Sequence, residues 1–341
     1  MRAIEYSRTG SADVLFLVNR TAGSAGPEDV VVRIAVSAVN PTDWKTRQGS
    51  ADGAALPRPQ VPNQDGAGVV ESVGSAVTSL APGDRVWVWD AAYQRADGTA
   101  QELALLPAAQ VVPLPDGVSF DVGATLGVPA VTAHRALTAR EGGPDELAPG
   151  SLVGVVVLVA GGAGAVGHAA IQLAIWAGAT VLTTVSSAEK ATLASAAGAD
   201  HVIDYTVENV ASRVHELAPG GVDVIVEVNS VANLALDLEI LAMGGTIAIY
   251  AGSGADTPTV PVRIAMGKNA RLQFLLKYTI SAAQNQAAIR AVTAAAAAGA
   301  LGVGAQNGLP LTRFPLERTA DAHRAVENDV IGKVLIDVAA L

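Results

Sequence analysis

The chain has 341 residues, of which 50% are hydrophobic and 16% are charged, and its formal net charge is −10. This length exceeds what one ordinary hydrophobic core supports, so we expect two domains. The acidic charge argues against nucleic-acid binding, and the absence of cysteine excludes disulfides, a thiolate nucleophile and cysteine-ligated zinc.

The first 125 or so residues have the pattern of a β-rich domain. Apolar and β-branched runs predict strands at residues 30–39, 69–73 and 85–89. Prolines and glycines recur at short intervals between them, as in small barrels and sandwiches. The N-terminus lacks the apolar core of a signal peptide, so we expect a cytoplasmic protein.

The pattern changes near Gly127, where strand and helix candidates begin to alternate. We expect strands at residues 155–160, 180–185, 201–203, 223–228 and 246–250. We expect helices at residues 165–177, 188–197, 207–217 and 232–241. This alternation predicts a doubly wound parallel sheet with helices on both faces.

A stretch without charge, residues 147–188, raises the question of a membrane segment. Glycines interrupt it, it contains His168 and Gln172, and its period changes from a continuous apolar run to helical spacing. Buried parallel strands have this composition, so we expect no membrane span.

A glycine turn joins the first of these strands to the first helix. Gly162, Gly164 and Gly167 fit the G-x-G-x-x-G pattern, which brings a backbone close to the pyrophosphate of a dinucleotide. The amides that open the helix, at Ala165, Val166 and Gly167, then face the negative charge. The alternative is a glycine-rich turn in a buried strand–helix unit without a ligand.

The second strand of the alternation ends in Ser186 and Ser187, where binders of NAD carry an acid that contacts the adenosine ribose. Lys190 follows at the start of the next helix. Hydroxyl groups and a cation favour NADPH, whose 2′-phosphate they can bind. Glu189 argues the other way unless it faces solvent at the helix start, and Ser186 has the alternative role of an N-cap.

The end of the chain loses the regular alternation after about residue 268. An alanine-rich helix is expected to start near residue 282 and run through residues 294–298, because alanine is the best helix former. Residues 311–341 predict a strand, a helix at 318–327 and a strand at 333–338.

Motifs along the whole chain, taken in order, resemble those of the medium-chain dehydrogenase/reductase superfamily in its zinc-independent quinone oxidoreductase branch. They are residues 39–44 (VNPTDW), 63–70 (NQDGAGVV), 82–86 (PGDRV), 98–102 (GTAQE), 127–133 (GVPAVTA), the glycine turn, 198–205 (GADHVIDY), 322–325 (AHRA) and 332–334 (GKV).

This resemblance implies a GroES-like catalytic domain, residues 1–126 and 268–341, with a nucleotide-binding Rossmann domain, residues 127–267, inserted in it. It implies a homodimer, often formed through the edge of the nucleotide-domain sheet. It also places Lys190 and Tyr205 at the 2′-phosphate of NADPH, and Thr132 beside the nicotinamide.

The resemblance further places Asn40, Asp43, Trp44 and Gln64 near the nicotinamide and substrate. Zinc-dependent relatives carry a cysteine where this chain has Asn40 and a histidine where it has Gln64, so we expect no metal. Asn40 or Gln64 can hydrogen-bond a carbonyl oxygen that gains charge, and Trp44 can stack on a ring. The alternatives are a turn residue before proline for Asn40, a helix cap for Asp43 and a core position for Trp44.

Without a metal, the hydride acceptor should already be electrophilic, which favours a quinone. An NADPH-dependent enoyl or alkenal reductase needs the same residues with a different pocket shape. A non-catalytic NADPH-binding redox sensor is the alternative outside the enzymes, and a zinc alcohol dehydrogenase would need zinc in stoichiometric amount.

Overall fold

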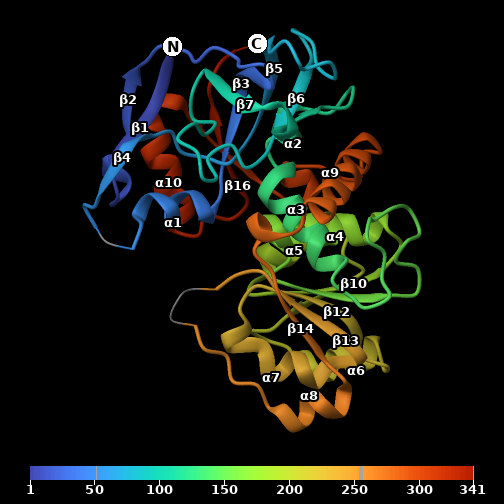
Figure 1. Cartoon of the computed structure of the whole chain (residues 1–341). Coiled ribbons are helices and arrows are strands. Elements are labelled where there is room, and N and C mark those ends of the chain that lie inside the picture. The colour runs from blue at the N-terminus through green and yellow to red at the C-terminus, as the bar shows by residue number, and fades with distance from the viewer. Residues whose placement is uncertain (51, 253–255, 341) are drawn as a thin grey trace. The chain divides into compact units, whose positions relative to one another are not determined.

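The structure, a computed structural model, describes residues 1–50, 52–252 and 256–340. The chain forms two compact units (Figure 1): residues 1–128 with 311–341, and residues 129–310. The first unit is therefore built from both chain ends. The second unit continues past the boundary expected at residue 267, because α9 (Ala282–Ala297) packs against α3 (Val131–Leu137) and α4 (Ala165–Trp176).

The first unit is rich in strands, as expected. Seven strands form one sheet in the order β15-β16-β3-β5-β6-β8, with β7 paired to β3, and three form a second sheet in the order β2-β1-β4. Their bounds are β1 (Arg2–Arg8), β2 (Phe16–Asn19), β3 (Asp29–Val39), β4 (Ala55–Gln60), β5 (Asp65–Val73), β6 (Arg85–Val88), β7 (Leu103–Pro107), β8 (Val111–Pro113), β15 (Leu311–Pro315) and β16 (Lys333–Asp337).

Strand β5 starts four residues earlier than its apolar pattern indicates. Its first part contains Gly66 and Gly68, which are poor strand formers when judged from sequence. In the fold, a Cβ on Gly68 would lie 1.9 Å from the carbonyl oxygen of Arg33 on β3. The register between β3 and β5 also shifts nearby, between Ile34 and Val36. A glycine is therefore required where these two backbones approach closely.

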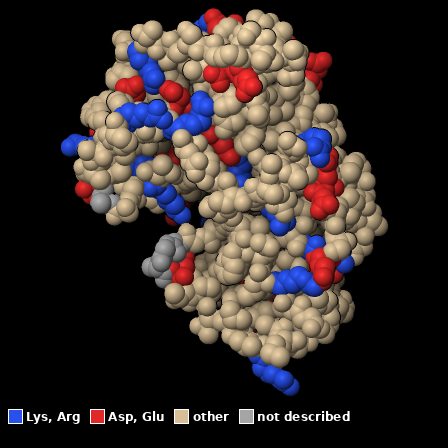
Figure 2. Space-filling view, in the orientation of Figure 1, with Lys and Arg blue, Asp and Glu red and all other residues tan. Residues whose placement is uncertain are grey.

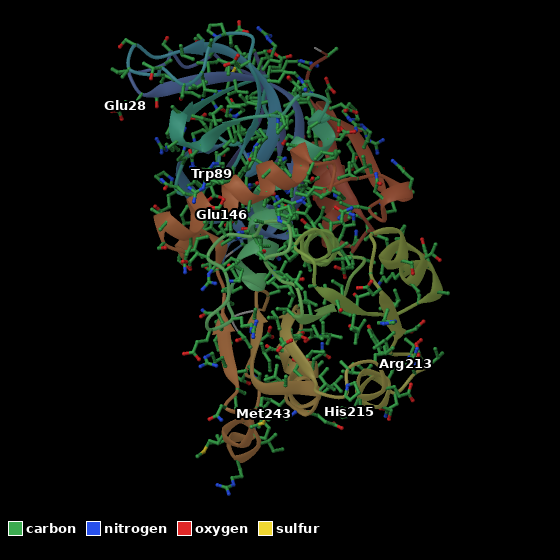
Figure 3. All side chains as sticks on the ribbon, turned by 90° about the vertical axis from the view of Figure 1, so that its right-hand side faces the viewer. Glu28, Trp89, Glu146, Arg213, His215 and Met243 are labelled. Atoms are coloured by element: carbon green, nitrogen blue, oxygen red, sulfur yellow. The ribbon has the colours of Figure 1, made fainter. Side chains whose placement is uncertain are left out.

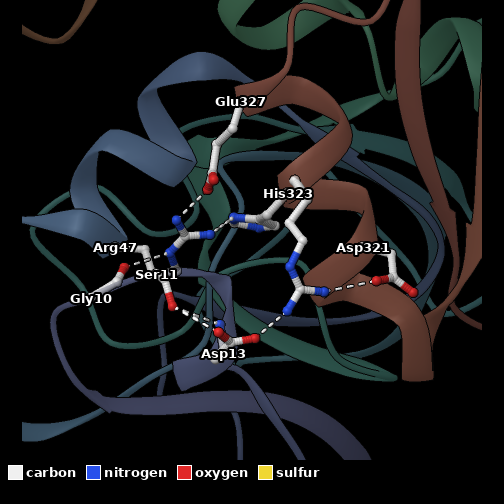
Figure 4. A network of polar contacts seen from close by, with 8 residues as sticks. Gly10, Ser11, Asp13, Arg47, Asp321, His323 and Glu327 are labelled. Carbon is white, nitrogen blue, oxygen red and sulfur yellow. Dashed lines mark hydrogen bonds and ion pairs between the residues drawn. The ribbon is translucent and has the colours of Figure 1, made fainter.

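The two chain ends of the first unit are joined through a buried arginine (Figure 4). Arg47 on α1 (Pro41–Gln48) is 1% exposed, donates from Nε to the carbonyl of Gly10 at 3.1 Å and forms an ion pair with Glu327. Its Nη1 lies 3.3 Å from Nδ1 of His323 on α10 (Thr319–Glu327). Burial, assisted by the Arg47 charge, lowers the pKa of His323 to about 3, so this histidine is a neutral acceptor for the guanidinium.

Among the described residues, this unit also contains helix α2 (Phe120–Gly123).

The second unit contains a parallel sheet of six strands in the order β11-β10-β9-β12-β13-β14. Every neighbouring pair is parallel. The strands are β9 (Val156–Ala160), β10 (Thr180–Val185), β11 (His201–Asp204), β12 (Val222–Glu227), β13 (Leu241–Ile249) and β14 (Arg271–Phe274). The other helices are α5 (Ala188–Ala196), α6 (Val210–Leu217), α7 (Ser230–Ile240) and α8 (Val262–Lys268). The order 3-2-1-4-5-6 is that of a dinucleotide-binding fold, so the expected fold class is confirmed.

The uncharged stretch is explained by this sheet. Val157 and Val159 on β9 and Val181 on β10 are fully buried, since helices cover both faces of a parallel sheet. In the described part of the chain, no helix is both long and apolar enough to cross a bilayer. On the face shown in Figure 2, basic and acidic side chains are interspersed and form no continuous basic surface.

Candidate functional site

The glycine turn follows β9 at the carboxyl edge of the sheet, and each glycine has a different reason for its place. Gly161 has φ +71° and makes the sharp turn. A Cβ on Gly162 would lie 2.2 Å from Oγ1 of Thr183, and one on Gly167 would lie 2.4 Å from the Gly161 carbonyl oxygen. Gly162 and Gly167 therefore allow the turn and α4 to pack tightly against the sheet.

Gly164 differs from Gly162 and Gly167 because the space that its Cβ would occupy is open. A Cβ there would meet no described atom closer than the Gly161 carbonyl oxygen at 3.4 Å. Gly164 is the N-cap of α4, and the N–H groups of Ala165, Val166 and Gly167 in the first turn have no intrahelical acceptor. A cradle of free amides under an open glycine fits a pyrophosphate.

Ser186, Ser187 and Tyr205 lie at the same carboxyl edge as the turn. β10 pairs with β9 through Thr184↔Ala160 and with β11 through Val185↔Asp204. The parallel register therefore brings the residues after these strands together. Tyr205 is 54% exposed, so its ring is accessible beside the two serines.

The two serines have distinct contacts. Ser187 is the N-cap of α5, and its hydroxyl accepts from the backbone N–H of Lys190 at 3.3 Å. Ser186 instead accepts from Nζ of Lys190 at 2.9 Å. The capping role considered for Ser186 therefore belongs to Ser187. Glu189 is exposed in the first turn of α5, the place where acids interact favourably with the helix dipole.

Thr132 lies on α3, which packs against α4 and β12 within the second unit. Its side chain is 7% exposed. The structure thus brings the glycine turn, the serines, Lys190 and Tyr205 to one sheet edge, and it places Thr132 on a helix that packs against the helix following the turn.

In the first unit, the carboxylate of Asp43 joins two of the other candidates. Its Oδ2 accepts from the backbone N–H of Asn40 at 2.7 Å, and its Oδ1 accepts from that of Gln64 at 3.1 Å. Asn40 is the N-cap of α1 and Asp43 is the third residue of its first turn, so the capping role considered for Asp43 is present together with the link to Gln64. Burial raises the pKa of Asp43 to about 8, and the nearby Asp65 adds to this effect.

The side-chain amide of Asn40 is held at both ends. Nδ2 donates to Oδ2 of Asp65 at 2.8 Å, and Oδ1 accepts from Nζ of Lys333. Asp65 and Lys333 lie in two of the motifs quoted above, but the sequence assigned them no role. The available signal was a charged residue at the start of each of two strands, directly before small or apolar residues, which is unusual in a buried strand unless the charge is paired.

The side-chain amide of Gln64 has an N–H donor without an acceptor among the atoms that the structure describes, whereas the amide nitrogen of Asn40 already donates one hydrogen bond. Oε1 of Gln64 accepts from the backbone N–H of Ala92 at 3.1 Å, which fixes the orientation of the amide. Within the described residues, no acceptor contacts its Nε2. The side chain is 3% exposed, so the amide presents an oriented N–H group with little access to solvent.

Trp44 follows Asp43 on α1 and is half-buried, with the Lys45 ammonium 5.7 Å from its ring centroid. No hydrogen bond joins it to Asn40 or Gln64 in the described chain. Its ring is therefore neither a fully buried core group nor part of the polar cluster.

The histidines have other roles. Oriented contacts hold three buried ones, since His134 Nε2 accepts from Leu147 N, His168 Nε2 contacts the Asn307 carbonyl and His323 contacts Arg47. His215, labelled in Figure 3, is exposed on α6. Among residues 1–50, 52–252 and 256–340, no three His, Asp or Glu side chains form a group able to hold a metal ion.

Known proteins resemble this chain along its whole length. Residues 26–116 match the family described as alcohol dehydrogenase GroES-like domain, and residues 165–305 match that described as zinc-binding dehydrogenase. The quinone oxidoreductase of Rattus norvegicus is 30% identical over 347 residues, covering 98% of this chain and 97% of its own length. The NADPH-dependent alkenal/one oxidoreductase of Arabidopsis thaliana is 31% identical over 343 residues, covering 98% and 79%.

Solved structures agree with the fold. The Escherichia coli quinone oxidoreductase complexed with NADPH has a TM-score of 0.79 and 25% identity, covering 99% of this chain and 100% of its own. An NAD-dependent alcohol dehydrogenase has a TM-score of 0.84 and 28% identity, with coverage of 99% and 100%. With its glycine cradle and its sheet order, the chain is an oxidoreductase that uses a nicotinamide dinucleotide, and it belongs to the quinone oxidoreductase family of the medium-chain dehydrogenase/reductase superfamily.

Proposed function

We propose that this protein is an NADPH-dependent reductase of quinones or similarly electrophilic carbonyl compounds and that it works without zinc. The observation that carries this proposal is the pair of oriented amides, Asn40 and Gln64, in a chain without cysteine. A neutral amide can donate a hydrogen bond to an oxygen that gains charge, but it cannot polarise an unactivated alcohol as a metal does.

The residues for NADPH lie on the second unit. The free amides of Ala165, Val166 and Gly167 would hold the pyrophosphate. Ser186, Ser187, Lys190 and Tyr205 would surround the 2′-phosphate, and Thr132 would face the nicotinamide. When bound, NADPH supplies the hydride.

The first unit would orient the acceptor. Nε2 of Gln64 would donate to the acceptor oxygen as negative charge develops on it, and the second N–H of Asn40 Nδ2 would serve the same purpose. The half-buried ring of Trp44 would pack against a flat substrate. Because both amides are almost fully buried, their hydrogen bonds are stronger than in water.

The cofactor assignment is tested by Lys190→Ala. We expect the Kd for NADPH to rise about 10- to 100-fold, since a charge-assisted contact is lost, while the Kd for NADH is nearly unchanged. Fluorescence titration with both dinucleotides measures this. Glu189→Gln, one residue away and exposed, is the control: it should leave both affinities unchanged. Equal weakening of NADPH and NADH by Lys190→Ala would contradict the assignment, and loss of NADH binding in Glu189→Gln would instead favour an NAD site.

A second candidate activity is the reduction of α,β-unsaturated carbonyls. It is favoured by the Arabidopsis thaliana relative, whose name specifies alkenals and alkenones. Steady-state oxidation of NADPH by a quinone and by an enone separates the two activities. Fast enone turnover without quinone turnover would assign the protein to the second. Tight NADPH binding without oxidation by either acceptor would indicate a non-catalytic sensor, and stoichiometric zinc on metal analysis would indicate an alcohol dehydrogenase.

We also propose that two copies associate through the edge of the second unit's sheet. β14 is the last strand of that sheet, so its outer edge pairs with no other strand of the described residues. Large apolar side chains are exposed along β14, the residues after it and the preceding α8, and Met243 on β13 (labelled in Figure 3) is also exposed. The exposed side chains on α8, on β14 and after it, with their exposed fractions, are Val262 (63%), Ile264 (53%), Met266 (63%), Phe274 (61%) and Leu276 (57%). An exposed apolar surface of this kind marks an interface.

A further inference from the structure

A buried lysine contacts the amide that we place at the acceptor. Lys333 is 2% exposed, Asn40 is 1% exposed and Asp65 is 0% exposed. β16 runs antiparallel to β3 with Val334 opposite Val39, and this register places Lys333 opposite Asn40. Nζ of Lys333 donates to the Val39 carbonyl at 2.9 Å as well as to Oδ1 of Asn40.

The two partners of Asn40 determine the orientation of its amide. An ammonium group only donates hydrogen bonds, and an ionised carboxylate only accepts them. With Lys333 at Oδ1 and Asp65 at Nδ2, a flipped amide would place NH2 against the ammonium and oxygen against the carboxylate. The amide therefore has one orientation, and its second N–H has a fixed direction.

A charge is not needed at residue 333 to fill the space that the side chain occupies. A methionine would fill almost the same volume without removing an ammonium from water, but it would leave the buried Asp65 without the nearby positive charge, which costs stability. What a methionine cannot do is donate to Oδ1 of Asn40. The ammonium thus has two effects, its charge beside Asp65 and the orientation of the Asn40 amide, and only the second depends on the contact with Oδ1.

We propose that Lys333 is a positioning residue of the reductase reaction, which together with Asp65 fixes the amide of Asn40 so that its free N–H points at the acceptor oxygen. The proposal rests on the proposed function. It assigns to Lys333 no contact with NADPH or with the acceptor.

The kinetic test compares Lys333→Met, Asn40→Ala and the double variant. Lys333→Met should lower kcat about 10- to 100-fold, the size of effect that misplacing a catalytic group produces, and leave the KM for NADPH unchanged. Because Lys333 acts through Asn40, the double variant should have the kcat of Asn40→Ala alone. The proposal would be overturned if the two single decreases of kcat multiplied in the double variant. It would also be overturned if Lys333→Met raised the KM for NADPH and left kcat unchanged.

A chemical rescue keeps the test valid if Lys333→Met does not fold. The chain contains no cysteine, so Lys333→Cys introduces a single thiol that can be alkylated in the unfolded chain before refolding. Bromoethylamine restores an ammonium at almost the reach of lysine, whereas iodoacetamide adds a neutral amide. We expect activity to return with the first reagent only. Equal activity of the two products would contradict an orienting role for the ammonium.

A control and a readout independent of activity separate this proposal from the proposed function. Lys268 also donates from Nζ to backbone carbonyls, those of Glu239 and Leu241 at 2.6 Å, so Lys268→Met removes comparable contacts far from the amides in sequence and should leave kcat unchanged. A neutron crystal structure of Lys333→Met, which distinguishes nitrogen from oxygen, should show the Asn40 amide turned or in two orientations. If the wild type reduces no acceptor, the proposed function fails, and an unchanged amide in this crystal structure would overturn the positioning role by itself.

Discussion

At the scale of single residues, the glycines that follow strand β9 have different local roles. The positive φ belongs to Gly161, outside the G-x-G-x-x-G pattern, while Gly162 and Gly167 allow close packing and Gly164 leaves open space. The pattern records only where side chains are missing. Which atoms a Cβ at each glycine would meet depends on Thr183 and on the path of the backbone, and both follow only from the fold.

This division of roles predicts different outcomes for two alanine variants. Gly167→Ala places a Cβ against a backbone oxygen and should lower the free energy of unfolding by about 1–3 kcal/mol. Gly164→Ala meets no such obstacle, so it should change stability by less than about 1 kcal/mol, yet weaken NADPH about ten-fold or more because its methyl group enters the ligand's space. Urea unfolding and NADPH titration measure both.

Gly220→Ala is the matched control, because a Cβ there meets nothing within 4 Å. It should leave stability and NADPH binding near those of the wild type. Normal NADPH binding by Gly164→Ala would show that the cradle above α4 is not the pyrophosphate site.

The contacts of Asn40 and Gln64 were less predictable than the form of the glycine turn. The motif resemblance matched Asn40 and Gln64 to metal ligands of zinc-dependent relatives, but it did not show that Asp43 bonds the backbones of both, or that Lys333 reaches Asn40 across 293 positions of sequence. Contacts between residues so distant in sequence follow from strand register, which local pattern does not encode.

Gln64→Met tests the role of the free amide. The variant should lower kcat about 10- to 100-fold, because one hydrogen bond to the developing charge is lost, with little change in the KM for NADPH. Gln110→Met is the control, since Gln110 donates from Nε2 to the Asp90 carbonyl at 3.1 Å in the same region of the fold without a free amide donor assigned to it. An equal decrease of kcat in both variants would mean that Gln64 only holds the loop in place.

At the scale of elements, strand and helix positions in the second unit followed the sequence closely, because buried parallel strands and alternating helices have strong patterns. The elements that sequence missed or shortened depend on pairing. β4 contains Pro57 and Pro59, and the first half of β5 contains two glycines. Such residues disfavour strands locally, and tertiary pairing overrides that preference.

Strand β12 and helix α7 are joined by two buried acids. Glu227 and Asp237, 0% and 1% exposed, interact with each other, and this interaction favours a proton on Asp237. Glu227 also accepts from the side chain of Asn233 at 3.1 Å. Burial, followed by the charge of Glu227, raises the pKa of Asp237 to about 9 from an ordinary value of 3.8.

This pair predicts a pH-dependent stability. Between pH 4 and pH 9 the folded chain retains a proton that the unfolded chain releases, so the free energy of unfolding falls as the pH rises, by at most about 1.4 kcal/mol per pH unit from this group. Asp237→Asn keeps a donor to Glu227 without a titrating proton. It should therefore be more stable than the wild type near pH 9, with the advantage shrinking toward pH 5.

Urea unfolding at pH 5, 7 and 9 measures this dependence, with Glu216→Gln, an exposed acid on α6, as the control that should keep the wild-type profile. An Asp237→Asn protein with the same loss of stability on the alkaline side would show that the pair carries no shared proton.

At the scale of the whole molecule, the discontinuous first unit is the feature that local patterns could not establish. β16 pairs with β3 although almost 300 residues separate them, and Arg47 joins α1 to α10 through Glu327 and His323. Periodicity near the C-terminus predicted a strand, a helix and a strand, while the motif resemblance alone implied that these return to the first domain.

The proposed association through β14 would join two copies of the whole molecule. Phe274→Asp places a charge on the exposed edge, so it should shift the protein from dimer to monomer, since a like charge would face its copy across a two-fold interface. Sedimentation equilibrium over a range of concentrations measures the shift. Phe16→Asp, at a residue 60% exposed on β2 of the other unit, is the control. A wild type that is monomeric at all concentrations, or a Phe274→Asp protein that stays dimeric, would exclude this edge as the interface.

We propose that this chain transfers hydride from NADPH to an electrophilic carbonyl compound without a metal. The most direct measurement is the initial rate of NADPH oxidation with a quinone, using protein treated with a strong chelator and checked for zinc by elemental analysis. Full activity is expected at a zinc content far below one atom per chain. Activity that disappears with chelation and returns with added zinc would show that the reaction needs the metal.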